Sequence, residues 1–480
     1  MGGTNQEVRH YDLAVIGAGS AAEAAAAEAR RRGKSVALVE RGVIGGTCPS
    51  VGCVPSKSLL AAAAVRATAM SGRFPGIATS AGPVDLAGLV EDKDQMLTVL
   101  RQRDHVERLD REGVDVLVGS AAFAPSQEDR PVLLVAGRDG AETQVVADQV
   151  IVASGAGPSI PEVPGLQEVD YLTYATAMSL DRVPESLLVV GGNAVGLEQA
   201  QLFARLGAET TVIEVASRIA PHEDPTVSSA LREALTAEGL TIMTEATLTH
   251  VESTPTGIEA TLTHDGETLT IAAEKILIAT GRRPATDGLN LATVGVETGP
   301  RGEVLVDEQL RTANPRIWAA GDVTGVAQFV YVAHAQGTAA AANALGDENR
   351  TLDYTAMPRV TFTSPSVAAV GLAPADAEAR GQEYEQRELP LSSVPRAILD
   401  RRFHGVLKLV SDPTTQRLLG VHMVGEDAGD IVGAATYAMS AGLTVQQLAT
   451  TWAPAFTMAE SLKLAAQLSP VPSSSTELQA

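Results

Sequence analysis

A succession of strand, glycine turn, helix and strand occurs twice in this 480-residue chain and constrains its fold more than any other feature. In each copy an apolar run enters a glycine turn, a helical stretch follows, and a second apolar run ends in a glutamate, Glu40 or Glu214. The first glycine of the turn, Gly17 or Gly191, precedes that glutamate by 23 residues in both copies. We therefore expect an α/β protein with two Rossmann-like nucleotide-binding domains.

The first turn has the pattern GxGxxA, Gly17-Ala18-Gly19-Ser20-Ala21-Ala22. Glycines allow a tight turn and let the backbone approach a pyrophosphate, which is stabilised by the N-terminus of the following helix. We expect Gly17, Gly19 and Ser20 to bind a dinucleotide, and Glu40 to accept hydrogen bonds from its ribose hydroxyls. An ordinary strand-to-helix turn without a ligand is the alternative.

The second turn, Gly191 to Gly196, has Asn193 where the middle glycine is expected. Asparagine tolerates positive φ better than most residues, so we expect this turn to form as well, with Gly191 and Gly196 binding a second dinucleotide. Glu214 suits a ribose 2′-hydroxyl and repels a 2′-phosphate, which favours NADH. Arg218, four residues later, would reduce that repulsion, so NADPH stays possible.

The remaining patterns indicate how the domains follow one another. Alternating apolar runs over 114–154 predict strands that close the first domain, and a similar series follows the second βαβ unit. An apolar run ending in Gly-Asp at 321–322 predicts a return to the first domain. The expected divisions are 1–155 and 284–356 for the first nucleotide-binding domain, 156–283 for the second, 357–468 for an α+β domain, and 469–480 for a disordered tail.

Composition excludes several classes of function. The net charge of −22 repels nucleic acid and anionic lipid surfaces. Apolar stretches such as 59–65 are too short or too interrupted for a convincing membrane span, and the leader Met1 to His10 lacks the apolar core of a secretory signal. Two cysteines are too few for a secreted disulfide framework. We expect a cytoplasmic protein that binds neither nucleic acid nor membrane.

The two cysteines, Cys48 and Cys53, are separated by four residues in GGTCPSVGCVPSK. They lie at a predicted entry into a helix, where the helix N-terminus lowers the pKa of a thiol, so the pair suits reversible disulfide chemistry. Lys57 follows Cys53 by four residues on the same helical face and can pair with a carboxylate beside a redox cofactor. The alternatives are a structural disulfide or half of a zinc site, which would need two more ligands.

That segment resembles the flavoprotein disulfide reductases, the pyridine nucleotide-disulfide oxidoreductase family that includes dihydrolipoamide dehydrogenase, glutathione reductase and mercuric reductase. The resemblance extends over about residues 11–467 and implies FAD in the first domain and NAD(P)H in the second. It also implies that Cys53 contacts the flavin and that Cys48 is the interchange thiol facing the substrate. Further implied site residues are Thr47, Lys57 paired with Glu198, Gly281, Asp322 at the flavin ribitol, and His334, which is equally compatible with a packing role.

Within the family, the segments 352–371, 394–397 and 457–467 resemble mercuric reductase, and the resemblance implies a homodimer joined by the C-terminal domain. Disulfide-reducing members have a His-Pro-Thr-x-x-Glu signature whose histidine protonates the leaving thiolate. This chain has Ala455 at the histidine position and Glu460 at the glutamate position, with no third cysteine. Mercuric reductases have a tyrosine there and a cysteine pair near the C-terminus.

This combination favours reduction of Hg(II) or a similar soft, thiol-bound metal, with Cys48 and Cys53 as its transient ligands. The absence of a proton donor at Ala455 argues against lipoamide or glutathione disulfide as substrates. Three alternatives stay open: a dihydrolipoamide dehydrogenase-like disulfide reductase, an NADH:quinone or dye reductase, and a flavin-binding redox sensor without turnover.

Overall fold

The computed structural model describes residues 7–125, 130–346 and 348–472. The chain forms two compact units, each built from three separate segments. Unit 1 comprises Met1–Ser56, Gly88–Ile160 and Gly281–Leu352, and unit 2 comprises Lys57–Ala87, Pro161–Thr280 and Asp353–Ala480. The domain boundaries expected from the sequence stay predictions. Most of the predicted leader, Met1 to Gln6, lies outside the described residues.

Unit 1 contains the first nucleotide-binding sheet. Its strands are β1 (Glu7–Ile16), β2 (Val36–Glu40), β3 (Asp115–Val118), β4 (Ser120–Ala124), β5 (Val132–Ala136), β6 (Glu142–Val152) and β16 (Ile317–Ala319). The order is β3-β2-β1-β6-β5-β4, and β16 also pairs with β6. Strands β3, β2, β1, β6 and β16 are parallel, whereas β5 and β4 continue the sheet as an antiparallel hairpin.

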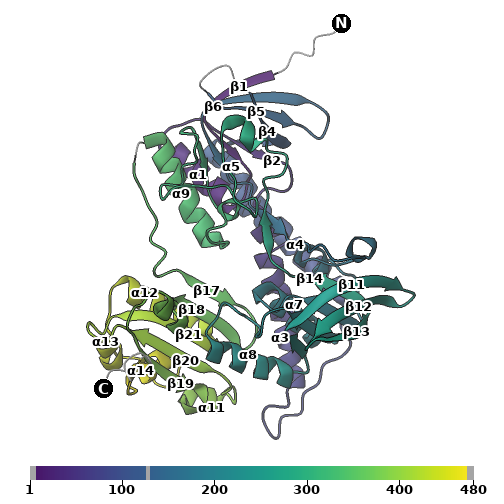
Figure 1. The fold of residues 1–480 in the computed structure, drawn as a ribbon, viewed down its shortest axis with the longest axis vertical. Coiled ribbons are helices and arrows are strands. Elements are labelled where there is room, and N and C mark those ends of the chain that lie inside the picture. The colour runs from purple at the N-terminus through teal and green to yellow at the C-terminus, as the bar shows by residue number, and fades with distance from the viewer. Residues whose placement is uncertain (1–6, 126–129, 347, 473–480) are drawn as a thin grey trace. The chain divides into compact units, whose positions relative to one another are not determined.

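Two alanine-rich helices of unit 1, α1 (Ser20–Arg31) and α9 (Val330–Gly346), pack side by side (Figure 1). A Cβ atom added to Gly337 of α9 would lie 2.0 Å from the carbonyl oxygen of Ala21, so only glycine permits this helix spacing. The alanines of α1 join the apolar side chains of β1 and β2 in one buried core. Small residues therefore bring α1, which follows the first glycine turn, close to the chain segment that returns from the second domain.

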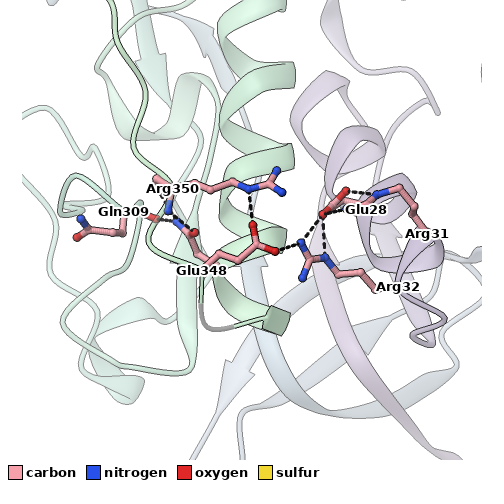
Figure 2. Close-up of polar contacts among 7 residues, drawn as sticks. Glu28, Arg31, Arg32, Gln309, Glu348 and Arg350 are labelled. Carbon is pink, nitrogen blue, oxygen red and sulfur yellow. Dashed lines mark hydrogen bonds and ion pairs between the residues drawn. The ribbon is translucent and has the colours of Figure 1, made fainter.

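An ion-pair network ties the end of α1 to the segment after α9 (Figure 2). Glu28 accepts hydrogen bonds from Arg31 and Arg32, and Arg32 also reaches Glu348, which binds Arg350. The bond from Arg31 holds the pKa of the Glu28 carboxyl below its usual value, although burial opposes this shift. Because Glu28 is buried, its two arginine partners satisfy a charge that would otherwise be costly to remove from water.

Unit 2 repeats the nucleotide-binding pattern. A parallel sheet has the order β10-β9-β8-β14, and a three-stranded antiparallel sheet has the order β11-β12-β13. Helices α7 (Ala194–Leu206) and α8 (Pro225–Ala237) belong to this part of the chain. The strands are β8 (Ser186–Val190), β9 (Glu209–Glu214), β10 (Thr241–Thr244), β11 (Ala246–Thr254), β12 (Gly257–His264), β13 (Glu267–Ala273) and β14 (Lys275–Ile278).

The C-terminal part of unit 2 is a six-stranded antiparallel sheet with the order β17-β18-β21-β20-β19-β22. Its strands are β17 (Pro358–Thr361), β18 (Ser366–Gly371), β19 (Glu385–Pro390), β20 (Val406–Ser411), β21 (Leu418–Gly425) and β22 (Val471–Pro472). Helix α12 (Ala428–Ser440) packs on β17, β18 and β21 (Figure 1), and α13 (Val445–Thr450) packs on α14 (Glu460–Ala466). The expectation of disorder from residue 469 is wrong for the first residues, because Val471–Pro472 pairs with β19. The rest of that tail lies outside the described residues.

The segment between β2 and β3 is helical. It contains α2 (Thr47–Ser50), α3 (Cys53–Met70), α4 (Leu86–Arg101), the π-helical turn η1 (Gln102–Val106) and α5 (Glu107–Glu112). Among the described residues, the stretch Thr47–Met70 is long and apolar enough to cross a membrane by length and composition. A core helix of a protein that never enters a membrane meets the same criterion, so this is weak evidence for a span.

His422 of β21 is fully buried in unit 2. Its Nε2–H donates to the Leu372 carbonyl at 2.8 Å, whereas the buried Nδ1 has no hydrogen-bond partner among the described residues. Burial lowers the pKa of this imidazole from 6.5, and Arg359 acts in the same direction against Asp224 and Glu223. The native state therefore holds the ring neutral.

We expect His422 to make the folded protein sensitive to acid. A lowered native pKa contributes stability above pH about 6.5 that is lost as the pH falls toward the native pKa, since the unfolded chain then binds a proton that the native state rejects. As the pH falls from 8 to 5.5, the Tm of the wild type should fall relative to the Tm of the His422→Gln variant. A difference that does not change with pH would contradict this role.

Candidate functional site

The first glycine turn has a backbone conformation that excludes residues with a side chain at its first position. Gly17 has φ +114°, and a Cβ atom there would lie 2.4 Å from the Ala153 carbonyl oxygen. Its N–H donates to the Val39 carbonyl at 2.8 Å. This bond holds the turn, which leads from β1 into α1, against the end of β2. Gly19 is the N-cap of α1 and brings no side-chain cap, so the first N–H groups of the helix stay available to an anion.

Glu40 lies at the end of β2, beside this turn. Its Oε2 accepts the Ala18 N–H at 2.8 Å, and its Oε1 accepts the Gly42 N–H at 2.5 Å. A carboxylate has about four acceptor positions, so two backbone bonds orient it and leave capacity for two ribose hydroxyls. The turn and this carboxylate therefore fit the adenosine and pyrophosphate portion of a dinucleotide. Ser20, the first residue of α1, donates its hydroxyl to the Val330 carbonyl at 3.1 Å.

The loop that carries the cysteines packs directly on the first glycine turn. The Gly45 N–H donates to the Ala18 carbonyl at 2.8 Å. Gly46 has φ +72°, and a Cβ atom on it would lie 2.7 Å from the Cα atom of Gly19. Only glycines allow this approach, which brings the redox cysteines next to the nucleotide turn.

The two cysteines lie at the starts of successive helices. Cys48 is the second residue of α2 and is half-buried, whereas Cys53 is the first residue of α3 and is exposed. Gly52 between the helices is closely packed, because a Cβ there would lie 2.9 Å from the Thr47 carbonyl oxygen. The predicted entry into a helix at Cys53 is therefore confirmed, and the positive end of the α3 dipole favours a thiolate at this position.

Lys57, one turn after Cys53, pairs with Glu198 of α7, as the family resemblance implies. The Lys57 Nζ lies 2.7 Å from Glu198 Oε2, and Glu198 Oε1 accepts the Phe362 N–H at 2.8 Å. The same ammonium stands 4.6 Å from the centre of the Phe362 ring. Phe362 was not predicted, because a single aromatic residue in a strand pattern looks like ordinary packing. It holds both partners of the ion pair through its backbone and its ring.

The second glycine turn reproduces the first. Gly191 has φ +113°, and a Cβ there would lie 2.5 Å from the Ala279 carbonyl oxygen. Gly196 is equally constrained, because a Cβ there would lie 1.9 Å from the Gly191 carbonyl oxygen. The expectation of positive φ at Asn193 is wrong. This residue is extended at φ −104°, and its side chain accepts the Ala194 N–H at 2.9 Å, so it serves as a helix N-cap.

Glu214, the glutamate beside the second turn, accepts backbone hydrogen bonds in the same way as Glu40. Glu214 Oε2 accepts the Gly192 N–H at 2.7 Å, and Oε1 accepts the Ala216 N–H at 2.9 Å. Arg218 is turned to its own loop, where Nη2 donates to the Pro221 carbonyl at 2.8 Å.

Asp322, predicted at the flavin ribitol, forms an ion pair with Arg282, with Oδ2 and Nη1 2.5 Å apart. Arg282 follows Gly281, which has φ +111° in the strand-leaving motif, and it was not predicted as a partner. The Gly321 N–H donates to the buried Gln336 of α9 at 2.7 Å, so the Gly-Asp turn is fixed from two sides. His334 is exposed on α9, which is the opposite of a buried packing residue.

The segment at the missing histidine is exposed. Ala455 is exposed, Trp452 is 97% exposed and Phe456 is 60% exposed. Glu460 at the start of α14 accepts the Phe456 N–H at 3.1 Å, which places this glutamate in the local turn. Apolar side chains so open to solvent are typical of a surface that another chain covers.

Comparisons with known proteins agree with this geometry. The family model of the pyridine nucleotide-disulphide oxidoreductases matches residues 11–337, and the model of the dimerisation domain of the same family matches residues 357–466. The chain belongs to the pyridine nucleotide-disulphide oxidoreductase family.

Within this family its relatives include mercuric reductases. The mercuric reductase of Streptomyces lividans is 51% identical over 95% of this chain and 96% of its own length, and that of Staphylococcus aureus is 43% identical over 95% and 82%. Among solved structures, LpdA from Mycobacterium tuberculosis matches with TM-score 0.85, 28% identity and coverage of 95% and 99%. A Cu(II) complex of the HOCl-induced flavoprotein disulfide reductase RclA from Escherichia coli matches with TM-score 0.84, 27% identity and the same coverage.

The chain is thus a mercuric reductase-like oxidoreductase that uses FAD and NAD(P)H. Its dimerisation domain supports a homodimer. Among the described residues, no group of three or more histidine, cysteine, aspartate and glutamate side chains could hold a metal ion.

The different positions of the two cysteines lead to a spectroscopic prediction. If Cys53 is the thiol beside the flavin, Cys53→Ser should abolish the long-wavelength thiolate-to-flavin absorption band of the two-electron-reduced holoenzyme. Cys48→Ser should show that band before any reduction, because Cys53 then lacks a disulfide partner. The measurement is the visible spectrum of both variants during anaerobic titration, and identical behaviour would refute the assignment of roles.

Proposed function

We propose that the protein reduces Hg(II) presented as a small-thiol complex, with NADH as the electron donor. The observation that carries the proposal is the cysteine pair at two helix starts combined with Ala455 at the proton-donor position. The relatives named mercuric reductase support the same substrate. The structurally similar RclA forms a Cu(II) complex, which supports a metal ion as a ligand of this fold.

The residues of this chain perform three tasks in the proposed reaction. The cysteine thiolates of Cys48 and Cys53 bind the soft metal and displace its thiol ligands. The Lys57–Glu198 pair places a fixed positive charge one turn from Cys53 on α3. The glycine turns and their glutamates hold the two dinucleotides. When bound, FAD supplies the two-electron transfer between NAD(P)H and the cysteine pair.

The competing functions make different demands. A disulfide reductase needs an acid for each departing thiolate, a contribution of roughly 10²–10⁴ in rate, and Ala455 provides none. A quinone or dye reductase would not need the cysteines at all. A redox sensor would bind both cofactors without sustained turnover.

We expect the purified enzyme to release mercury vapour from a Hg(II)–thiol complex in a 1:1 ratio with NADH consumed. Its kcat/KM should exceed that for lipoamide or glutathione disulfide. The measurement combines loss of NADH absorbance with trapped volatile mercury, and a Cu(II)–thiol complex and a quinone complete the panel of acceptors. Cys48→Ser is the matched variant, since it should lose metal reduction and keep reduction of the quinone.

Vigorous lipoamide reduction without mercury release would place the enzyme with the disulfide reductases. Equal quinone reduction by the wild type and the variant, with no metal turnover, would favour the second alternative. NADH loss without mercury release in air would indicate leakage of electrons to oxygen.

The preference for NADH rests on Glu214. Its carboxylate is oriented by two backbone N–H groups, and it faces no cation from Arg218, whose guanidinium bonds to the Pro221 carbonyl. A 2′-phosphate at ~4 Å from this carboxylate would experience a repulsion of about 4 kcal/mol at an effective dielectric near 20. The hydroxyl of NADH would instead donate a hydrogen bond.

Glu214→Gln should therefore reduce the preference for NADH by at least about tenfold and by at most roughly 10³-fold, because it removes the charge that repels a 2′-phosphate by about 4 kcal/mol. Its single amide oxygen can still accept only one of the two backbone N–H groups. Glu214→Arg should reduce the preference further or invert it. The measurement is the ratio of kcat/KM for NADH to that for NADPH. A wild type that prefers NADPH would contradict the proposal and point to Arg218 as the dominant group.

A further inference from the structure

A loop of unit 2 contacts the second glycine turn and is fixed from outside the nucleotide-binding sheet. This loop, residues 215–224, leads from the end of β9 to the start of α8, and we call it the nucleotide loop. The Ala220 N–H donates to the Gly192 carbonyl at 2.7 Å. Ile219 is fully buried, and a Cβ atom added to Gly192 would lie 3.2 Å from its Cγ2 atom. The nucleotide loop therefore packs directly on the turn, beside Glu214.

Ala220 of the nucleotide loop has a strained backbone conformation. Its φ is +44°, in the left-handed region, and the residue is buried. Asparagine and aspartate tolerate this region better, whereas alanine has no polar side chain to stabilise it. Such a conformation persists only where the surrounding structure imposes it, and it occurs often at ligand clamps. Contacts from other parts of the chain must therefore hold the loop in this shape.

Two ion pairs fix the end of the nucleotide loop to the C-terminal sheet. Glu223 accepts two parallel hydrogen bonds from Arg359 of β17, from Nε at 2.8 Å and from Nη2 at 3.0 Å. Asp224, the N-cap of α8, accepts hydrogen bonds from the Lys408 ammonium of β20 with both oxygens, at 2.8 and 3.0 Å. Burial raises the pKa of the Asp224 carboxyl, but Lys408 outweighs burial and the pKa is lower than usual. The native state therefore keeps this buried carboxylate charged.

The two cations belong to one row of residues across the C-terminal sheet. Arg359 lies opposite Ala369, which lies opposite His422. His422 is in turn opposite Lys408. Residues directly opposite each other point to the same face of a sheet, and α8 packs on β20 and β21 (Figure 1). The sheet thus presents two positive charges to two consecutive acids, and all of these residues belong to unit 2.

We propose that Arg359 and Lys408 of the C-terminal domain position the nucleotide loop and thereby set the affinity of the enzyme for NADH. The proposal rests on the proposed role of Glu214 and the second glycine turn as the NADH site. Two contacts with that site pass through the loop, because the Ala216 N–H orients Glu214 and the Ala220 N–H bonds to the turn. A loop released at its end would lose the conformation that maintains both contacts.

Arg359 and Lys408 are positioning residues, because they act through the nucleotide loop and not on the nucleotide itself. The ribose and pyrophosphate that the turn would hold are remote from the bond that changes in hydride transfer. Interactions with such groups stabilise the bound nucleotide and the transition state equally, so their loss changes affinity and not the rate of the chemical step. Release of the loop should therefore weaken NADH binding selectively.

The test follows flavin reduction by NADH in the oxidised holoenzyme after rapid anaerobic mixing. Arg359→Gln should raise the apparent Kd for NADH by roughly 3–10-fold and change the limiting rate of flavin reduction by less than about twofold. Glu223→Gln should have the same effect. The double variant should bind NADH no more weakly than either single variant, because both substitutions remove one interaction.

The matched control is Arg182→Gln. Arg182 also makes two hydrogen bonds to a glutamate, Glu274, within unit 2. That pair lies at the start of β14, whereas the glycine turn follows the end of the parallel strand β8. Arg182→Gln should therefore leave both the Kd and the limiting rate unchanged.

An unchanged Kd in Arg359→Gln, or a change confined to the limiting rate, would overturn the proposal. Additive effects of the two single substitutions would also overturn it, as would an equal loss of affinity in Arg182→Gln, which would indicate general loosening. If Arg359→Gln does not fold, Arg359→Lys decides, because lysine keeps the charge without the two parallel hydrogen bonds. It should raise the Kd by a smaller factor, and an unchanged Kd would refute the positioning role.

Mercury and other acceptors do not enter this experiment, so failure of the proposed substrate does not affect its result. The role of Glu214 is tested separately by the ratio of kcat/KM for NADH to that for NADPH. Arg359→Gln is judged by the Kd of whichever of the two nucleotides the wild type binds more tightly. The two proposals can therefore fail independently of each other.

Discussion

The contact between the cysteine loop and the first nucleotide turn is the constraint on which the chemistry depends. Gly46 and Gly19 approach so closely that a Cβ atom on Gly46 would lie 2.7 Å from the Cα atom of Gly19. The Gly45 N–H also donates to the Ala18 carbonyl. The turn that we expect to hold a dinucleotide and the loop that holds the thiols are therefore one rigid piece of unit 1. Electron transfer needs such a fixed relation between cofactor and thiol, and glycine is the residue that permits it.

Much of the fold was predictable because the chain contains the same unit twice. Gly17 and Gly191 have nearly the same φ angle, +114° and +113°. Glu40 and Glu214 each accept the N–H of the turn's second residue and the N–H two residues after the glutamate. Such repeated hydrogen bonding follows from local sequence, so the pattern of glycines, apolar runs and glutamates was enough to predict it. The Lys57–Glu198 pair was predicted only through the family resemblance, since 141 residues separate its partners.

The features that sequence did not predict depend on long-range packing or on local geometry without a pattern. Asn193 was expected to need positive φ, but the middle position of the turn is extended at Gly19 as well, with φ −88°. The requirement there is for a short side chain, and asparagine meets it as an N-cap. Phe362 acquires its role from Lys57 and Glu198, which lie far away in sequence. The sequence pattern at Gln102–Val106 does not predict the π-helical turn that forms there.

Ala455 and the cysteine pair have one explanation in the chemistry of the proposed reaction. A disulfide that is reduced releases thiolates, and a positioned acid assists their departure. A soft metal that is held by two thiolates needs two electrons and no proton for its reduction. The exposed segment around Ala455 is then free from acid catalysis and can be shaped by the contacts of the dimerisation domain alone.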